Sequence, residues 1–237
     1  MLTIYKRELS SYFRSPVAYC IMGFFMAIVG LMFWVNSILQ SKAQFSETLS
    51  SIGMYLTFII PIITMKLLAD EKKNGTEVLL RTCPVSMWKI VIGKYLSAVT
   101  LFLVMIILTS IYPILIAFLV EEGAVIGSMQ DLGNYIGFFM LGMAYLAVSL
   151  FVSSFTESQS VAAVSGIVVL LILYFLQSIG TSLGSGVGSV LQWIAPLARY
   201  NDFTVGAFNV ASLIFYFTFS AMFVFLTYVN LERKRVI

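Results

Sequence analysis

The sequence predicts an all-α, polytopic membrane protein with six transmembrane helices, and three observations lead to this fold class. Of its 237 residues, 60% are hydrophobic and only 11% are charged, whereas soluble globular domains contain about 25% charged residues. The hydrophobic residues form six long runs, and a helix of about 20 residues crosses the roughly 30 Å hydrocarbon core of a bilayer. The connections are too short for a separate soluble domain, so residues 1–237 are expected to form a single transmembrane domain. The expected spans are Val17–Leu39, Ile52–Leu68, Ile90–Val120, Gly133–Phe155, Val161–Ile179 and Ala211–Leu231.

Basic residues predict the orientation of these spans, because Lys and Arg are retained on the cytoplasmic side. Twelve of the 14 basic residues and six of the 11 acidic ones fall in the two termini and the inner connections, a net charge of +6. The outer side has Lys42 and Arg199 against five acidic residues, a net charge of −3. Both termini are therefore predicted to be cytoplasmic. Topology explains the basic excess, and no nucleic-acid partner is required.

The residue types that are missing narrow the possible chemistry. The chain contains no histidine, the commonest general base and metal ligand, so no catalytic, cofactor-binding or metal-binding residue is predicted. Ion-coupled secondary transporters usually hold Asp, Glu or His within the membrane, and the six spans hold none at mid-depth. That alternative is disfavoured, whereas a non-transporting membrane scaffold stays open. Polar side chains that either line a shared path or bond back to their own helices are Thr57, Thr64, Thr109, Ser110, Ser149, Ser165 and Gln177.

Two prolines interrupt the expected spans. Pro61 and Pro113 fall inside the second and third spans, where each removes a backbone donor and predicts a kink. The third run has 31 residues and would be about 46 Å long as a straight helix. It must therefore tilt, bend or project into the cytoplasm.

The N-terminal segment, residues 1–15, mixes apolar and charged side chains before Ser15-Pro16 marks the start of the first span. Lys6 and Arg7 alternate with apolar residues such as Phe13, a pattern that favours a short amphipathic helix in the inner membrane interface. The alternative is a segment that only anchors the topology.

The connection between the second and third spans is predicted to hold a short cytoplasmic helix over residues 70–82. Thr76 can cap such a helix, Glu77 suits the positive end of its dipole, and Pro84 ends it. The helix would display the pair Leu79-Leu80 in the cytoplasm. Exposed apolar residues rimmed by charge usually mark a docking surface, although the leucines could instead lie on the membrane interface.

The longest outer connection covers residues 180–210. Its apolar stretch before Pro196 favours a short interfacial or re-entrant helix, because irregular backbone is costly in lipid. A membrane-surface loop is the alternative. Gly180, Gly184 and Gly188 recur at every fourth residue, which permits close helix approach or a flexible loop.

Three stretches of the sequence match motifs that recur together in one family of membrane proteins. They are Glu71–Thr76 followed by Leu79-Leu80, Pro84–Ser86 and Gly93-Lys94; Arg7–Pro16; and Ser153–Ala163. In this order they resemble the coupling region, the amphipathic elbow and the tight inner turn between spans four and five of type-2 ABC transporter permeases. Within that family the chain looks closest to the permeases of gliding motility or of nitrous-oxide reductase maturation.

The resemblance implies a permease subunit of an ATP-driven exporter in a bacterial inner membrane. It would be embedded in membrane lipid and pair with a second copy or a paralogue, as a dimer. Two cytoplasmic ABC ATPase subunits would bind ATP and Mg, and an accessory extracytoplasmic protein is a further candidate partner. The sequence agrees with a separate ATPase: it has no Gly-x-x-x-x-Gly-Lys-Ser/Thr loop, since Tyr95 follows Gly93-Lys94. The expected docking residues are Glu71, Gly75, Thr76, Glu77, Leu79 and Leu80, with Lys6, Arg7 and Phe13 as elbow contacts.

Overall fold

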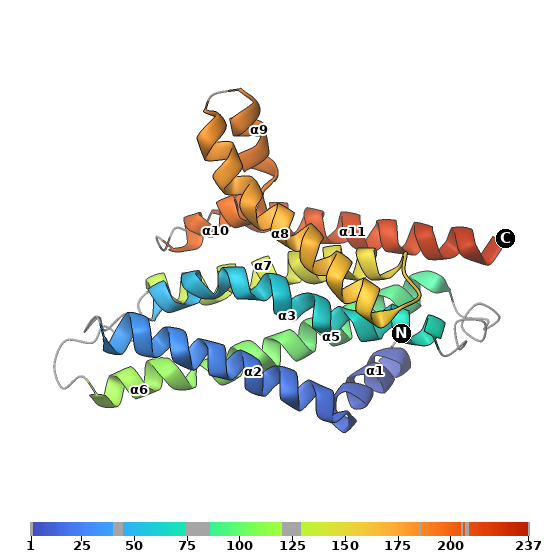
Figure 1. The fold of residues 1–237 in the computed structure, drawn as a ribbon, viewed down its shortest axis with the longest axis horizontal. Helices are drawn as coiled ribbons and strands as arrows, with labels where there is room; N and C mark the ends of the chain where they lie inside the picture. The colour runs from blue at the N-terminus through green and yellow to red at the C-terminus, as the bar shows by residue number, and fades with distance from the viewer. Residues whose placement is uncertain are drawn as a thin grey trace.

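The computed structural model describes residues 2–39, 45–73, 86–119, 129–184, 186–204, 206 and 209–236, and across these residues the protein is helical, with no strand (Figure 1). Most of the long α-helices run along one long axis, whereas α8 crosses it obliquely and the short α1, α9 and α10 lie in other directions. The elements are α1 (Leu2–Arg14), α2 (Pro16–Phe33), a π-helix η1 (Trp34–Ile38), α3 (Ser46–Lys73), α5 (Met87–Thr109), α6 (Ile111–Leu119), α7 (Met129–Ser153), α8 (Gln159–Leu183), α9 (Val187–Ile194), α10 (Pro196–Thr204) and α11 (Val210–Val236).

Six helical segments of the described chain are long and apolar enough to cross a membrane. This confirms the predicted all-α, polytopic fold class. The segments are Pro16–Ile38, Glu47–Ala69, Met87–Ile116, Asp131–Ser153, Gln159–Leu183 and Val210–Arg233. Each overlaps one of the six spans expected from the hydrophobic runs, and the largest difference at a single end is at the start of the second span, Glu47 instead of Ile52.

The two prolines act differently. α3 continues through Pro61 without a break, whereas the third span is interrupted at Ser110, three residues before Pro113. A proline ring clashes with the carbonyl four residues earlier and cannot donate to it. Thr109 is that residue for Pro113, and α5 ends there. The Ser110 hydroxyl donates to the Ile107 carbonyl at 2.6 Å, which satisfies one of the acceptors at the helix end.

α3 and α7 form the centre of the bundle. Both bury most of their membrane span, whereas α2, α8 and α11 expose most of theirs. Figure 1 shows α3 and α7 between α2 on one side and α11 on the other. Ile60 and Ile63 of α3 and Tyr145 and Leu146 of α7 are fully buried. The two central helices therefore pack against protein along their length, and the peripheral helices offer apolar faces to lipid.

The contact between α5 and α7 depends on a missing side chain. Gly142 of α7 faces the ring of Phe102 in α5, which is fully buried. A Cβ at Gly142 would overlap Cε1 and Cζ of that ring and lie 2.8 Å from its Cδ1. The ring is itself packed on Phe138 and Phe139 at centroid distances of 6.0 and 6.4 Å, so it has little freedom to move.

We expect Gly142→Ala to lower the free energy of unfolding by about 1–3 kcal/mol, the usual cost of overpacking a core. The measurement is denaturant-induced unfolding of the detergent-solubilised protein. Gly23→Ala is the matched control, because a Cβ at Gly23 meets nothing within 4 Å. Equal stability of the two variants would contradict the close α5–α7 contact.

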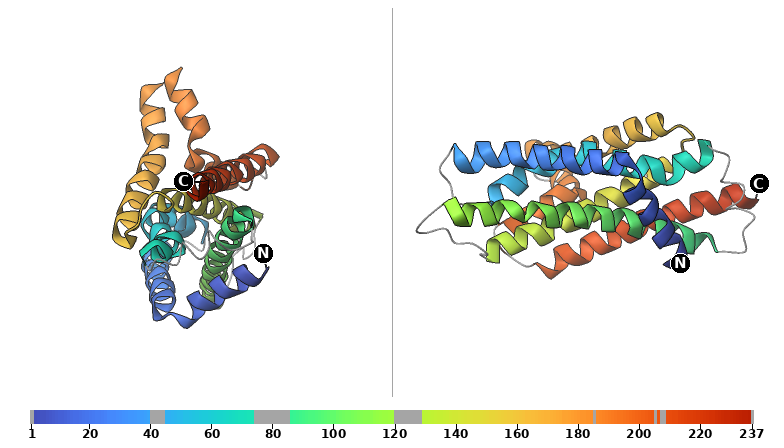
Figure 2. Two further views of the ribbon diagram at one scale, coloured as in Figure 1. Left: turned by 90° about the vertical axis from the view of Figure 1, so that its right-hand side faces the viewer. Right: turned by 90° about the horizontal axis from the view of Figure 1, so that it is seen from below.

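The described residues between α8 and α11 fold mainly as two short helices, α9 and α10, rather than as an irregular loop. α9 turns back beside the end of α8, and together they project beyond the other helices (Figures 1 and 2). A Cβ at Gly180 would lie 2.9 Å from the Gly188 carbonyl oxygen, and a Cβ at Gly188 would overlap the Gly180 carbonyl. Two of the three spaced glycines thus allow close approach of backbones. The third, Gly184, ends α8 with a φ of 69°, a conformation that glycine adopts most readily.

Candidate functional site

The amphipathic helix α1 lies across the bundle axis, at the end of the molecule that also holds the C-terminus (Figure 2). It ends at Arg14, the extended backbone of Ser15 (φ −89°, ψ 129°) then turns the chain into α2, and Pro16 occupies the first position of α2. Proline favours that position because its missing N–H would be unpaired there in any case. α1 packs mainly on α5 and also on α2. The flanks of residues 74–85, namely the end of α3 and the start of α5, lie at the same end of the molecule (Figure 1).

Tyr12 joins α1 to α3. Its ring is buried, and its hydroxyl donates to the Ile63 carbonyl at 2.9 Å. Burial, together with the nearby negative charge of Glu8, raises the pKa of the Tyr12 hydroxyl far above its usual range. The hydroxyl therefore stays protonated and remains a donor at every physiological pH.

Lys94 joins α5 to both α3 and α1. Its side chain is only 1% exposed, and Nζ donates to the Leu67 carbonyl of α3 at 2.6 Å. The Glu8 carboxylate of α1 lies 3.5 Å from the same Nζ. Glu8 also accepts a hydrogen bond from Arg7 at 2.6 Å. A buried ammonium needs such partners, because loss of its hydration costs several kcal/mol, by a rough estimate.

A third link lies between these two. Lys66 of α3 donates from Nζ to the Ser15 hydroxyl at 2.8 Å. Donors and acceptors at positions 63, 66 and 67 of α3 are thus all engaged by side chains of α1, of Ser15 between α1 and α2, or of α5. These positions belong to the last three turns of α3, which continues to Lys73 and leads into residues 74–85. The end of α3 is thus joined by side-chain hydrogen bonds to α1, to α5 and to Ser15 between α1 and α2.

The structure places the predicted docking residues only in part. Glu71 lies in the last turn of α3, one turn after Leu67. The other five, Gly75, Thr76, Glu77, Leu79 and Leu80, lie outside the described residues, as does most of the helix expected over 70–82. That helix remains a prediction. Its expected first residues are instead a continuation of α3, because no helix-breaking residue follows Pro61 until Asn74-Gly75.

The three elbow residues differ in exposure. Lys6 and Arg7 are exposed on α1. Phe13 is half-buried and packs against the hydrophobic core, so its ring holds α1 to the bundle. Lys6 and Arg7 therefore remain the elbow side chains that a partner protein could reach.

Sequence reasoning missed the residues that hold this end of the molecule together, namely Glu8, Tyr12 and Lys94. From the sequence, Lys94 is one of the inner basic charges and part of the Gly93-Lys94 match to the coupling region, and neither interpretation predicts its burial. Two signals were available: Lys94 stands eight residues into a hydrophobic helix, and Glu8 is the one acidic residue of a basic segment. An ionisable residue inside a span calls for a partner, and Glu8 is the nearest carboxylate before the first span.

The polar residues of the spans mostly bond to their own helices. Thr57, Thr109 and Ser165 donate to carbonyls three or four residues earlier at 2.7, 2.6 and 2.6 Å. Thr64 and Ser149 differ, because their hydroxyl oxygens lie 2.6 Å apart and connect α3 to α7. Within the described ranges, no group of three or more His, Cys, Asp or Glu side chains could hold a metal ion.

Comparison with known proteins identifies a family to which this sequence is similar. The family described as ABC-2 family transporter protein matches residues 2–231, nearly the whole chain. No curated protein matches the sequence. The match covers all six spans, the α1 elbow and the connection between α3 and α5. This chain therefore belongs to the ABC-2 family of transporter proteins, as a membrane permease subunit of an ABC transporter.

Proposed function

We propose that this permease subunit exports its substrate, with energy from a separate cytoplasmic ATPase that docks on residues 70–82 and on α1. The family implies association with an ABC ATPase. The observation that carries the proposal is the set of links at the inner end of α3, through Tyr12, Lys66 and Lys94. They connect the segment that precedes the docking region to α1, and through Ser15-Pro16 to α2.

The links suggest how motion would enter the bundle. A helix transmits displacement along its axis because each residue is hydrogen-bonded to the residue four positions away. α3 is the helix that leads into the docking region, and with α7 it forms the bundle centre. A push on the end of α3 would reach α7 through the buried contact between Thr64 and Ser149. The ATPase therefore needs to touch only one short segment to move the core.

We further propose that the complex is a dimer of permease subunits, two copies of this chain or this chain and a paralogue, in a bacterial cell membrane. An accessory extracytoplasmic protein would complete some assemblies. The relation to the permeases of gliding motility or nitrous-oxide reductase maturation also stays a prediction, carried by the resemblance of the coupling and elbow motifs.

The test is co-purification of the tagged full-length chain from its own membranes in mild detergent. We expect a second protein with a Gly-x-x-x-x-Gly-Lys-Ser/Thr loop to be recovered in equal amount, together with ATP hydrolysis that the permease alone lacks. A tagged six-span membrane protein from another family is the control for carry-over. Recovery of a permease dimer without any ATPase would overturn the proposal and favour a scaffold or an ion-coupled transporter.

A further inference from the structure

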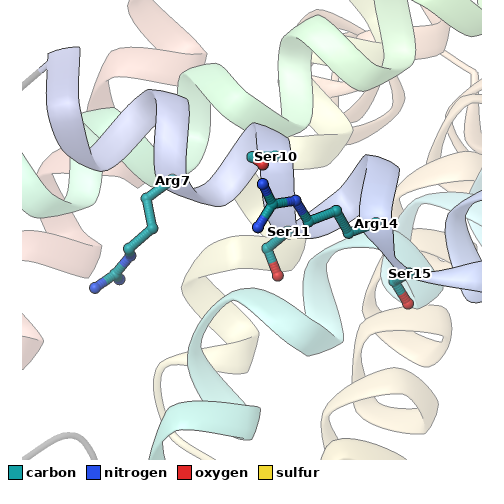
Figure 3. Close-up of a pocket in the computed structure, with 5 residues that line it drawn as sticks. All are labelled: Arg7, Ser10, Ser11, Arg14 and Ser15. Carbon is teal, nitrogen blue, oxygen red and sulfur yellow. The ribbon is translucent and has the colours of Figure 1, made fainter.

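An open hollow of about 410 Å³ lies beside α1 and is lined by two arginines and three serines. They are Arg7, Ser10, Ser11, Arg14 and Ser15 (Figure 3). Residues three, four and seven positions apart share one face of a helix, so the sequence itself places Arg7, Ser11 and Arg14 together. Each of the five offers an N–H or O–H donor, and none is a carboxylate. The hollow is within the usual size range of small-ligand sites.

The lining side chains do not all point the same way. Figure 3 shows the Arg14 side chain extending along the helix toward Ser10 and Ser11, whereas the Arg7 side chain extends away from these three residues. Arg7 is held by Glu8 at 2.6 Å, which occupies part of the five N–H donors of its guanidinium. Lys66 adds a third cation at the border, because its Nζ donates to Ser15 at 2.8 Å.

The position of the hollow relative to the first span indicates which class of ligand can reach it. α2 begins at Pro16, immediately after Ser15. From there, α2 exposes apolar side chains along its length, including Tyr19, Phe24 and Leu31. The hollow thus lies where the exposed apolar surface of α2 begins, which the orientation predicted from the basic residues puts at the level of the inner headgroups. The inner leaflet is the one that carries anionic lipids and attracts basic segments.

We propose that this hollow binds a phosphate group, supplied by the headgroup of an anionic phospholipid of the inner leaflet. A guanidinium matches two phosphate oxygens at once, and the serine hydroxyls donate to the remaining ones. The acyl chains would lie along the exposed side of α2. An acidic segment of a partner protein would satisfy the cations, but it would not use the apolar surface that continues from them. A bound lipid would fix α1 against the membrane as the inner end of α3 moves.

The experiment measures lipid retention on the full-length chain. The protein is purified in mild detergent, incubated with equal amounts of phosphatidylglycerol and phosphatidylcholine, and its bound lipids are counted by native mass spectrometry. We expect wild type to retain phosphatidylglycerol preferentially. Arg14→Gln combined with Ser11→Ala should reduce that preference roughly tenfold, as expected for loss of a charge-assisted hydrogen bond. Arg14→Lys keeps the charge but loses the planar guanidinium group. Its preference for phosphatidylglycerol should therefore lie between that of wild type and that of the double variant.

The control is Arg233→Gln, which removes an exposed inner arginine of α11 outside the hollow and should leave the preference unchanged. Equal losses in both arginine variants would overturn the site in favour of general surface charge, as would an unchanged preference in the Arg14 variants. Displacement of phosphatidylglycerol by inorganic phosphate would overturn the lipid as the source of the group. Loss of a co-purified protein with unchanged lipid retention would assign the hollow to that protein. The site needs only the inner placement of α1, so its failure would leave the proposed transport function untouched.

Discussion

Charge reversal at Glu71 together with Leu79→Asp is expected to abolish recovery of the ATPase with this protein, while membrane insertion stays intact. Glu71 is in the last turn of α3, and Leu79 is predicted to be displayed in the cytoplasm. The first change reverses a charge at the docking surface, and the second places a carboxylate where an apolar contact would be desolvated. A buried charge without a partner costs several kcal/mol, by rough estimate. We expect this cost to exceed the binding free energy that one docking helix contributes.

The matched control makes the same two changes in another inner connection. Phe155→Asp with Glu157→Lys alters exposed residues of the turn between α7 and α8, and we expect the ATPase to be recovered there at the wild-type level. Both variants are compared by pull-down with the tagged permease, and insertion is checked by the amount in the membrane fraction. Undiminished recovery with the Glu71 and Leu79 variant would refute the docking assignment.

Lys94→Ala is expected to lower the free energy of unfolding by about 3–5 kcal/mol, as for the loss of one member of a buried ion pair. The change removes the donor to the Leu67 carbonyl and the cation beside Glu8, and it leaves a cavity where the side chain was. The contact of α1 with α3 and α5 should loosen first. The measurement is the unfolding midpoint in detergent, together with the protease sensitivity of α1.

Two variants separate the causes. Lys89→Ala removes an exposed lysine from the start of the same helix and should change stability by less than about 0.5 kcal/mol, as surface substitutions usually do. Lys94→Met keeps most of the volume without the charge. If Lys94→Met is as stable as wild type, the lysine contributes to stability only through the volume that it fills in the core, and the proposed linkage of α1, α3 and α5 is wrong.

The sequence by itself determined the fold class and the number of spans. Hydrophobic length is a local property, since about 20 apolar residues cross a bilayer whatever surrounds them. The six expected spans therefore overlap the six observed ones. The clash of a proline ring involves only the preceding turn, so the sequence marks Pro61 and Pro113 alike, and only the structure shows that the helix is interrupted before Pro113 and continues through Pro61. Membership of the permease family was indicated by motifs that lie in the connections, and the family match confirms it.

Only the tertiary structure decided which polar residues hold the inner end together. Lys94 and Glu8 are 86 positions apart, and Tyr12 and Ile63 are 51 apart, so no local pattern reports that they meet. The same holds for the ring of Phe102 against Gly142, where the shape of one helix requires a missing side chain on another. Local periodicity determines which residues enter the membrane, whereas the pairing of helices depends on side-chain volume and hydrogen-bond partners from distant segments.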